Sequence, residues 1–259
     1  MFIINTFTGA NAQMSKDQIY SLFNQANENF RQANSTQDSE QAKRLYEKAI
    51  LAFEKIIEQG RIKNAKLYCN LGNAYFLKGD IGKAILNYRR AEKLDSSDTN
   101  IQKNLAFARS KRIDKVGVKT EKRVLQTLFF WHYDFAIKTK FALTCIFFGI
   151  VCICAAGTIW FGRSAPLILT FVISAIFTVC LFSSLIIESR TQASKICGVI
   201  TAKDVIARQG DGQNYSPSFK APLHEGTEFD LLESRPGWLH IKLFDESDGW
   251  IPDIAADLI

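Results

Sequence analysis

The chain has 259 residues, with 32 lysine and arginine residues against 26 aspartate and glutamate residues, which gives a formal net charge of +6. This length accommodates two small domains and one further segment. The basic residues are scattered and form no base-reading module, so a nucleic-acid partner is not expected. The six cysteines and three histidines show no Cys-x-x-Cys pair and no zinc spacing, so we expect neither a metal site nor a cofactor.

The first residues carry a pattern typical of exported proteins. In MFIINTFTGANAQ, an apolar run precedes Ala10-Asn11-Ala12, which has the small-x-small form of a signal-peptidase site. The run is short and lacks a basic start. We interpret residues 1–14 as the remnant of a signal peptide, with a frayed terminus as the alternative.

The stretch NLGNAYFLKGDIGKAILNYRRA, residues 70–91, contains two glycines followed by a lysine. A phosphate-binding loop of the Walker type requires four residues between its glycines and a hydroxyl residue after the lysine. Here two residues separate Gly79 from Gly82, and Ala84 follows the lysine. The stretch follows instead the helix–turn–helix pattern of a tetratricopeptide repeat. In this interpretation Gly79 ends the first helix and Asp80 caps the second.

The repeat recurs on both sides of this stretch. The sequence YEKAILAFEKII, residues 46–57, matches the second helix at an offset of 35 residues. The Asn-Leu-Ala motif at residues 104–106 matches Asn-Leu-Gly at residues 70–72, and no convincing second helix follows it. We therefore predict an all-α tetratricopeptide-repeat solenoid over residues 15–112, made of two repeats and a capping helix.

Four polar residues are predicted to face the binding groove of these repeats: Lys66, Asn70, Asn73 and Asn104. Amide side chains at such positions bind the backbone of an extended peptide, and Lys66 can pair with a carboxylate. The alternative is a solvated helix surface. For Asn70, a hydrogen bond to the neighbouring repeat is a further alternative.

Two runs of 21 residues without a charge, 141–161 and 167–187, occupy the middle of the chain. About 20 apolar residues are enough to span the hydrocarbon core of a bilayer. The short connection between the runs allows only a tight turn. We therefore predict a two-helix transmembrane hairpin over residues 141–187, which places both flanking domains on the same side of the membrane.

Residues 113–140, before the first span, are predicted to form a juxtamembrane amphipathic segment. Trp131 and Tyr133 suit the headgroup region of a bilayer, and apolar residues fall on one face of a helix over residues 121–135. The alternative is that this helix covers the last helix of the repeat domain.

Two cues disagree about the side of the membrane. Basic residues flank both spans, whereas the connecting loop holds only Arg163, and the positive-inside rule then places the flanking domains in the cytoplasm. The rule weakens when large domains flank the spans. The candidate signal peptide places the same domains on the outer side.

Residues 188–259 contain short apolar runs separated by Gly210-Asp211-Gly212, Pro236-Gly237 and Asp248-Gly249. These turns predict five short strands in a small all-β barrel, in a pattern that resembles bacterial SH3 domains. Eight apolar residues are predicted to fill it: Val199, Val205, Leu223, Phe229, Leu231, Leu239, Ile241 and Ile251.

Three aromatic residues, Tyr215, Phe244 and Trp250, are predicted to form a surface patch on this barrel, similar to the groove with which related domains bind polyproline. We expect Trp250 to be exposed because Ile251 beside it is the better core candidate. Trp238 is expected in the core. The alternative is that both tryptophans serve packing alone.

The order of these parts resembles the BatE family of the Bat (aerotolerance) operons. The segments NLGNAYFLKGDIGKAILNYRRA, FFWHYDF and GWLHIKL…GWI are similar to its repeat, juxtamembrane and SH3 segments. The resemblance covers nearly the whole chain, except for the incomplete signal peptide and a long insert after Phe30. It implies partners among membrane proteins with von Willebrand A domains and a MoxR-type ATPase. Signal peptides are usual in that family, so it favours the periplasmic side of a bacterial inner membrane.

We therefore expect a non-catalytic, membrane-anchored scaffold that binds protein partners through its groove and barrel. The alternative is a cell-wall-associated enzyme, or a peptidoglycan-targeting factor, that uses the SH3 domain. An enzyme requires a nucleophile and base or a carboxylate pair in a cleft. The clustered acids Asp245, Glu246 and Asp248 belong to a turn of a barrel too small to enclose a substrate, so no catalytic residue is expected.

Overall fold

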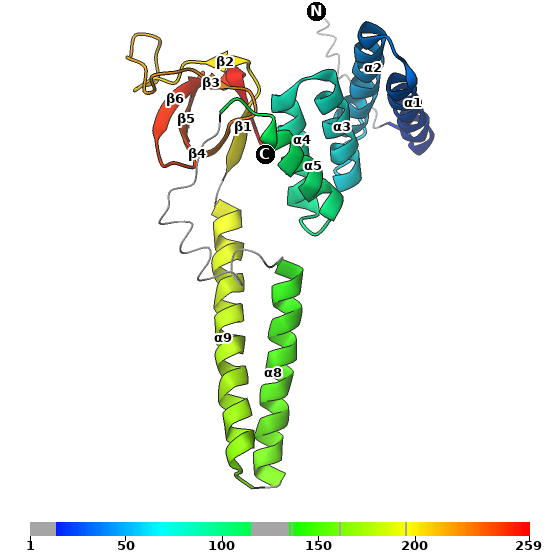
Figure 1. Ribbon diagram of the computed structural model, residues 1–259. Coiled ribbons are helices and arrows are strands. Elements are labelled where there is room, and N and C mark those ends of the chain that lie inside the picture. The colour runs from blue at the N-terminus through cyan, green and yellow to red at the C-terminus, as the bar shows by residue number, and fades with distance from the viewer. Residues whose placement is uncertain (1–13, 115–134, 136, 161, 195) are drawn as a thin grey trace, which may run out of the picture.

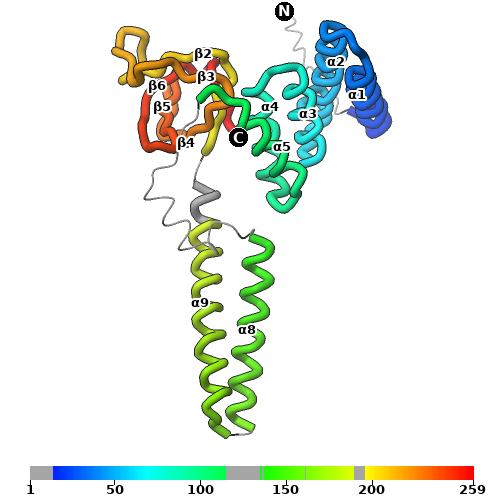
Figure 2. The backbone as a smooth tube through the Cα atoms, in the orientation of Figure 1, coloured from blue at the N-terminus to red at the C-terminus, as the bar shows by residue number. Residues whose placement is uncertain are grey.

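The computed structural model describes all residues except 1–13, 115–134, 136, 161 and 195. A helical array and a strand-rich region lie side by side at one end of the molecule, and two long helices project away from them (Figures 1 and 2). The predicted signal-peptide remnant and the predicted interfacial helix at 121–135 lie outside the described residues, apart from the last position of each.

Five helices form the helical array. They are α1 (Lys16–Ser35), α2 (Ser39–Glu58), α3 (Ala65–Lys78), α4 (Ile81–Leu94) and α5 (Thr99–Ser110). Each begins at a polar residue whose side chain accepts a hydrogen bond from a backbone N–H of the first turn: Ser15, Asp38, Asn64, Asp80 and Asp98. The turn between α3 and α4 depends on Gly79, whose φ of 99° is in the left-handed region that favours glycine. The sequence therefore predicted this turn correctly.

Small residues allow the helices of the array to pack closely. A Cβ atom on Gly72 of α3 would lie 2.7 Å from the ring of Tyr88 on α4, which is closer than van der Waals contact allows. The ring of Tyr88 thus fills the space that the glycine leaves, and its hydroxyl donates a 2.7 Å hydrogen bond to Asn73. The buried core runs from α1 to α5, with Phe53, Ile85 and Leu105 among its most buried side chains.

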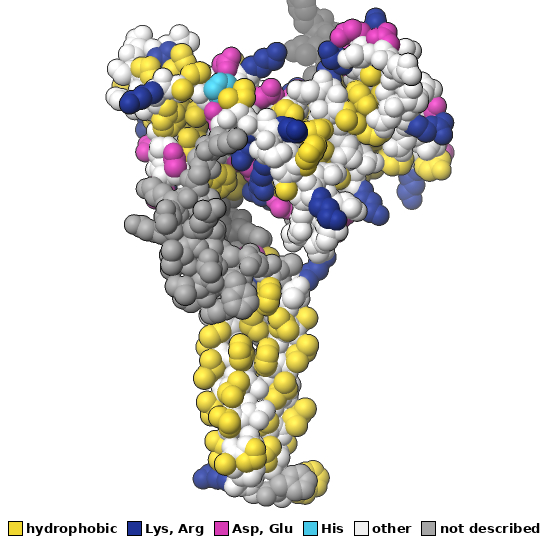
Figure 3. All heavy atoms as spheres, in the orientation of Figure 1, with side chains coloured by type: hydrophobic (Ala, Val, Ile, Leu, Met, Phe, Trp, Pro, Cys, Tyr) yellow, Lys and Arg dark blue, Asp and Glu magenta, His cyan; other side chains and the backbone are white. Residues whose placement is uncertain are grey.

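The two long helices are α8 (Ile137–Trp160) and α9 (Ala165–Ser194). Both contain a run that is long and apolar enough to cross a membrane, with mean hydropathies of 2.3 and 2.4, and only 11% of each run is buried. Hydrophobic side chains cover the visible surface of this helix pair, whereas charged side chains gather over the helical array (Figure 3). Lys140, in the first turn of α8, forms an ion pair with Glu188 of α9.

The strand-rich region, here called the β region, has seven described strands. They are β1 (Cys197–Ile200), β2 (Asp204–Val205), β3 (Leu223–His224), β4 (Glu228–Arg235), β5 (Trp238–Lys242), β6 (Asp248–Pro252) and β7 (Ala256–Leu258). Five of them form an antiparallel sheet in the order β6-β5-β4-β1-β7, and β2 pairs with β3. The sequence predicted five strands, and the described part of the region has seven.

Most of the predicted barrel residues do form the core of the β region. Val205, Leu223, Phe229, Leu239, Ile241 and Ile251 are buried together, and Leu231 packs against them. Val199 is a correction, because its buried side chain belongs to the core of the helical array. Successive residues of a strand face opposite sides, so Ile200 enters the β core while Val199 faces the helices.

Candidate functional site

The face formed by α3 and α5 contains the four predicted groove residues, and the structure brings two of them together. The Oδ1 of Asn73 accepts hydrogen bonds from Asn104 Nδ2 at 3.0 Å and from the Tyr88 hydroxyl at 2.7 Å. These two amides therefore connect the repeat to α5, as a packing role requires. Within the described residues, Asn73 Nδ2 and Asn104 Oδ1 have no partner, so one donor and one acceptor stay available to a ligand.

The other two predicted groove residues are on the surface of the same face. Lys66 is exposed and Asn70 is half-buried, and within the described part of the chain neither side chain makes a hydrogen bond or an ion pair. The hydrogen bond from Asn70 to the neighbouring repeat, which was an alternative from the sequence, is therefore not present among these residues.

The α3–α5 face has a simple charge pattern. Helices α3 and α5 contain no aspartate and no glutamate, whereas Lys66 and Lys103 are exposed on them. Phe107 of α5 is 56% exposed, lies 5.4 Å from the ring of Phe76, and has the ammonium of Lys111 5.2 Å from its ring centre. Such a face favours a ligand with carboxylates and an extended backbone.

The predicted aromatic patch of the β region does not form as expected. Tyr215 is 51% exposed and Phe244 36% exposed, but Trp250 is only 7% exposed. Trp238, which was predicted in the core, is half-buried. The expectation that Trp250 is exposed was therefore wrong.

Contacts on both faces of β6 explain the burial of Trp250. Ile251 pairs with Leu239 and faces the β core. On the opposite face, the ring of His240 stacks on Trp250 at 4.7 Å with an interplanar angle of 4°, and the Arg235 guanidinium lies 4.7 Å from the ring centre. Arg235 is held in turn by Asp211 at 2.8 Å.

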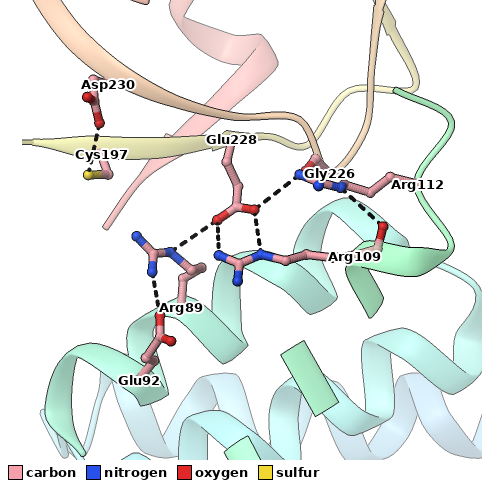
Figure 4. Close-up of polar contacts among 8 residues, drawn as sticks. All are labelled: Arg89, Glu92, Arg109, Arg112, Cys197, Gly226, Glu228 and Asp230. Atoms are coloured by element: carbon pink, nitrogen blue, oxygen red, sulfur yellow. Dashed lines mark hydrogen bonds and ion pairs between the residues drawn. The ribbon is translucent and has the colours of Figure 1, made fainter. Parts of the chain in front are cut away.

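A second site lies where the helical array meets the β region, and no single motif in the sequence predicted it. Glu228, at the start of β4, points into a group of three arginines from α4, α5 and the residues after α5 (Figure 4). Its carboxylate accepts two hydrogen bonds of 2.7 Å from Arg109 and one of 3.1 Å from Arg112. The Nε of Arg89 lies 3.2 Å away and completes an ion-pair network. We call these four residues the Glu228 cluster.

The carboxylate at the centre of the Glu228 cluster is both buried and charged. The Glu228 side chain is only 4% exposed. Burial alone would raise the pKa of this carboxyl, but the hydrogen bonds from Arg109 and the charges of the three arginines outweigh it and lower the pKa below its usual value. The carboxylate is therefore ionised at neutral pH, as bidentate pairing with Arg109 requires.

A second carboxylate, which is half-buried, joins the same two regions. Asp114 follows the helical array and accepts hydrogen bonds of 2.7 Å from the backbone N–H of His224 and from the Thr227 hydroxyl. The His224 ring nitrogen Nδ1 also lies 2.7 Å from this carboxylate. Burial opposes ionisation of Asp114, but these hydrogen bonds outweigh it and lower its pKa.

The contact with the β region explains why the second residue of its kind in the G-D-I-G-K stretch, Gly82, is a glycine. Its backbone N–H donates a 3.1 Å hydrogen bond to Glu225 of the β region. A Cβ atom at this position would lie 2.8 Å from the carbonyl oxygen of Ile200, so the β region can approach α4 only because residue 82 is a glycine. Neither a phosphate site nor the repeat pattern requires this residue.

The only signal for this contact in the sequence is a coarse one. Residues 1–112 have 18 basic against 11 acidic residues, and residues 188–259 have 7 basic against 12 acidic residues. Opposite net charges favour contact between the two parts, but they do not show which residues pair.

Comparison with known proteins bears on the helical array. Residues 65–98 match the family model of the tetratricopeptide repeat. Helices α3 and α4 are therefore similar to a tetratricopeptide repeat. The match covers both helices and the turn that follows them, in agreement with the repeat predicted from the sequence. No curated protein matches the chain.

Proposed function

We propose that this protein is a non-catalytic, membrane-anchored scaffold that binds a partner polypeptide on the α3–α5 face. The observation that carries the proposal is the tetratricopeptide repeat at residues 65–98. Stacked helical repeats of this kind present extended surfaces for binding. Among the described residues, no group of three or more histidine, cysteine, aspartate or glutamate side chains could hold a metal ion.

The partner segment is extended and acidic. Helices α3 and α5 themselves contribute the lysines Lys66 and Lys103 and no carboxylate, which favours a negatively charged ligand. Asn70, with the free donor of Asn73 and the free acceptor of Asn104, can bind a peptide backbone. The exposed ring of Phe107 supplies an apolar contact at the end of this face.

The membrane anchor is the helix pair α8–α9. Two runs with mean hydropathies above 2 and little burial suit a lipid environment. A hairpin of two spans returns the chain to its starting side. The Glu228 cluster is consistent with this topology, because the helical array and the β region can touch only when they are on the same side.

The β region acts as an SH3-like module in this proposal, and the chain belongs to a Bat-type envelope complex linked to stress or aerotolerance. Support comes from the order of the parts and from the resemblance to the BatE family. The partners are then membrane proteins with von Willebrand A domains and a MoxR-type ATPase, and the soluble parts lie on the periplasmic side of the bacterial inner membrane.

The test is a pair of surface changes on the α3–α5 face. Lys66→Glu with Asn70→Ala reverses one charge and removes one amide, and neither side chain has a partner within the described chain. The double variant is expected to lose about 2–4 kcal/mol of binding free energy for its partner. The loss is measured as reduced co-purification of partners from native membranes, quantified by mass spectrometry. Lys48→Glu, on the exposed surface of α2, is the matched control. Unchanged co-purification in the double variant would contradict the proposal.

A further inference from the structure

A histidine of the β region lies between two carboxylates at the contact with the helical array. His224 belongs to the short strand β3, and its ring nitrogen Nδ1 lies 2.7 Å from the carboxylate of Asp114, which follows α5. The other ring nitrogen, Nε2, lies 3.5 Å from the carboxylate of Asp204 on β2. Each nitrogen of the ring therefore faces a carboxylate, one from the helical array and one from the β region itself.

The contact with Asp114 decides which nitrogen of the neutral ring carries the proton. Burial raises the pKa of Asp114, but the hydrogen bonds from the backbone N–H of His224, from the Thr227 hydroxyl and from the His224 ring outweigh it and lower that pKa. The carboxylate is thus ionised at neutral pH, and an ionised carboxylate only accepts hydrogen bonds. Nδ1 is therefore the nitrogen that donates to Asp114.

The second nitrogen of the ring is the place where a further proton adds. A neutral imidazole carries one N–H, so with Nδ1 protonated its Nε2 presents a lone pair. This lone pair faces a carboxylate oxygen of Asp204, and two acceptors in that position repel each other. Protonation of Nε2 replaces the repulsion by a donor–acceptor contact and places a positive ring between two negative groups. The arrangement therefore suits the charged histidine better than the neutral one.

The other charged groups around the ring are engaged elsewhere or screened by water. Arg112 interacts with the charge of Asp114, but its guanidinium is paired with Glu228 at 3.1 Å. Glu225, the next residue along the chain after the histidine, turns toward α4, where its carboxylate accepts a backbone N–H at 3.1 Å. Lys203 is exposed, so water and salt screen its charge. The two flanking carboxylates therefore dominate the surroundings of the ring.

Solvent reaches this group from one side. The Asp204 side chain is 69% exposed, whereas those of Asp114 and His224 are 17% and 21% exposed. Asp204 is thus the outer carboxylate, where protons exchange with water, and Asp114 is the inner one, which belongs to the contact between the two regions. The pH of the solution can therefore act directly on this contact.

We propose that His224 is a pH-sensitive latch between the helical array and the β region. Histidine changes its charge between about pH 5 and 8. The outer carboxylate of Asp204 favours uptake of the proton, and the charged ring then binds Asp114 by a charge-assisted hydrogen bond, which is stronger than a neutral one. This stabilisation is complete at the acidic end of the range and is lost as the pH rises and the ring gives up its proton. The latch does not depend on the partner proposed for the α3–α5 face.

The test measures hydrogen–deuterium exchange of residues 222–228 in the full chain in detergent, at about pH 6 and about pH 8. Each rate is divided by the intrinsic rate of an unfolded peptide at the same pH. The pKa values of Asp114 and Glu228 are lowered and the arginines stay protonated, so these groups keep their charge between the two pH values. Protection at the lower pH should exceed that at the higher pH by about threefold or more.

Two substitutions assign this pH dependence to the latch. In Asp204→Asn the new amide can donate a hydrogen bond to a neutral Nε2, so the ratio of the two protection values should fall to about one. Position 204 is exposed, so folding is not at risk. His224→Asn keeps an N–H donor near the place of Nδ1 and cannot take up a proton, so it should also give a ratio of about one. His240→Gln, at the other histidine of the β region, keeps a donor for Asp248 and should retain the wild-type ratio.

Equal protection of the wild type at both pH values, or greater protection at the higher one, would overturn the proposal. A wild-type ratio in Asp204→Asn, or loss of the ratio in His240→Gln, would overturn it as well, because another group would then titrate. The outcome is separable from the test of the α3–α5 face, since Lys66→Glu with Asn70→Ala should retain the wild-type ratio. The expected ratio in a protein that captures no partner would support the latch and refute the proposed function.

Discussion

Glu228 of β4 accepts two hydrogen bonds of 2.7 Å from Arg109 of α5, across 119 positions of the chain. This bidentate pair is buried and joins the helical array to the β region. The relative orientation of the helical array and the β region depends on it, because Arg89 and Arg112 approach the same carboxylate.

Glu228→Gln should release the β region from the helical array. The change leaves the three arginines without the charge that they surround, and loss of one partner of a buried ion pair costs about 3–5 kcal/mol. Hydrogen–deuterium exchange on the full chain in detergent should rise in β1, β4 and α5. Glu40→Gln, whose partner Lys43 is on an exposed surface, is the control and should change exchange little. Unchanged protection of β4 in Glu228→Gln would show that the cluster does not hold the regions together.

Acidification should loosen the same contact. The folded pKa of Glu228 and that of Asp114 are lower than their unfolded values, so their stabilising contribution is complete above the unfolded pKa values. It is lost as the pH falls through the folded pKa values, which lie below the ordinary carboxylate range of about 4. Exchange at β4 should therefore rise below about pH 4 in the wild type. Glu228→Gln should show a weaker pH dependence, because Asp114 still contributes, and an equal pH dependence in both proteins would contradict this assignment.

Gly82→Ala should weaken the contact although alanine favours helices. In an isolated helix, replacing glycine by alanine would stabilise the helix by roughly 1 kcal/mol. Here the new methyl group would lie 2.8 Å from a backbone oxygen of the β region, and overpacking of this kind costs about 1–3 kcal/mol. Exchange should therefore rise in β1 and in the β3–β4 turn. A more protected β1 would show that the helix effect is the larger one.

Gly79→Ala is the comparison for this change. No atom lies within 4 Å of a Cβ atom at this position, but the φ of 99° is unfavourable for alanine by about 1–2 kcal/mol. We expect faster exchange in α3 and α4, with the contact to the β region retained.

Trp250→Ala should destabilise the β region more than Trp238→Ala. Trp250 is 7% exposed between His240 and Arg235, and removal of a buried aromatic side chain costs about 3–5 kcal/mol. Trp238 is half-buried, so its loss should cost clearly less. The exchange rates of β5 and β6 in the two variants measure the difference. The opposite order would restore the expectation drawn from the sequence.

The hairpin topology is testable with single cysteines on exposed turns. A membrane-impermeant maleimide is added to intact spheroplasts. It should label Ser97→Cys before α5 and Asp245→Cys after β5 to the same extent. Arg163→Cys between α8 and α9 should be labelled only if those two positions are not. Labelling of Ser97→Cys and Asp245→Cys before lysis would place these regions on the periplasmic side. The unmodified chain measures the background from its native cysteines. Different labelling at Ser97→Cys and Asp245→Cys would exclude a two-span hairpin.

The sequence by itself determined the local elements, because their signals are short in range. Helical spacing, Gly79 and the polar cap Asp80 specify the α3–α4 repeat, and the two uncharged runs specify α8 and α9. Alternation along the strands identified most of the β core, although the shortest strands carry too few residues to show a period.

Tertiary structure alone decided which side chains meet. Trp250 is buried because His240 and Arg235 cover the face of β6 that alternation left exposed, and Val199 turns toward the helices rather than into the β core. The Glu228 cluster joins residues more than 100 positions apart, and a pairing at that distance leaves no periodic pattern in the chain. Such contacts depend on how the folded regions dock, since charge attracts without specifying partners and only the packed interface selects Arg109 for Glu228.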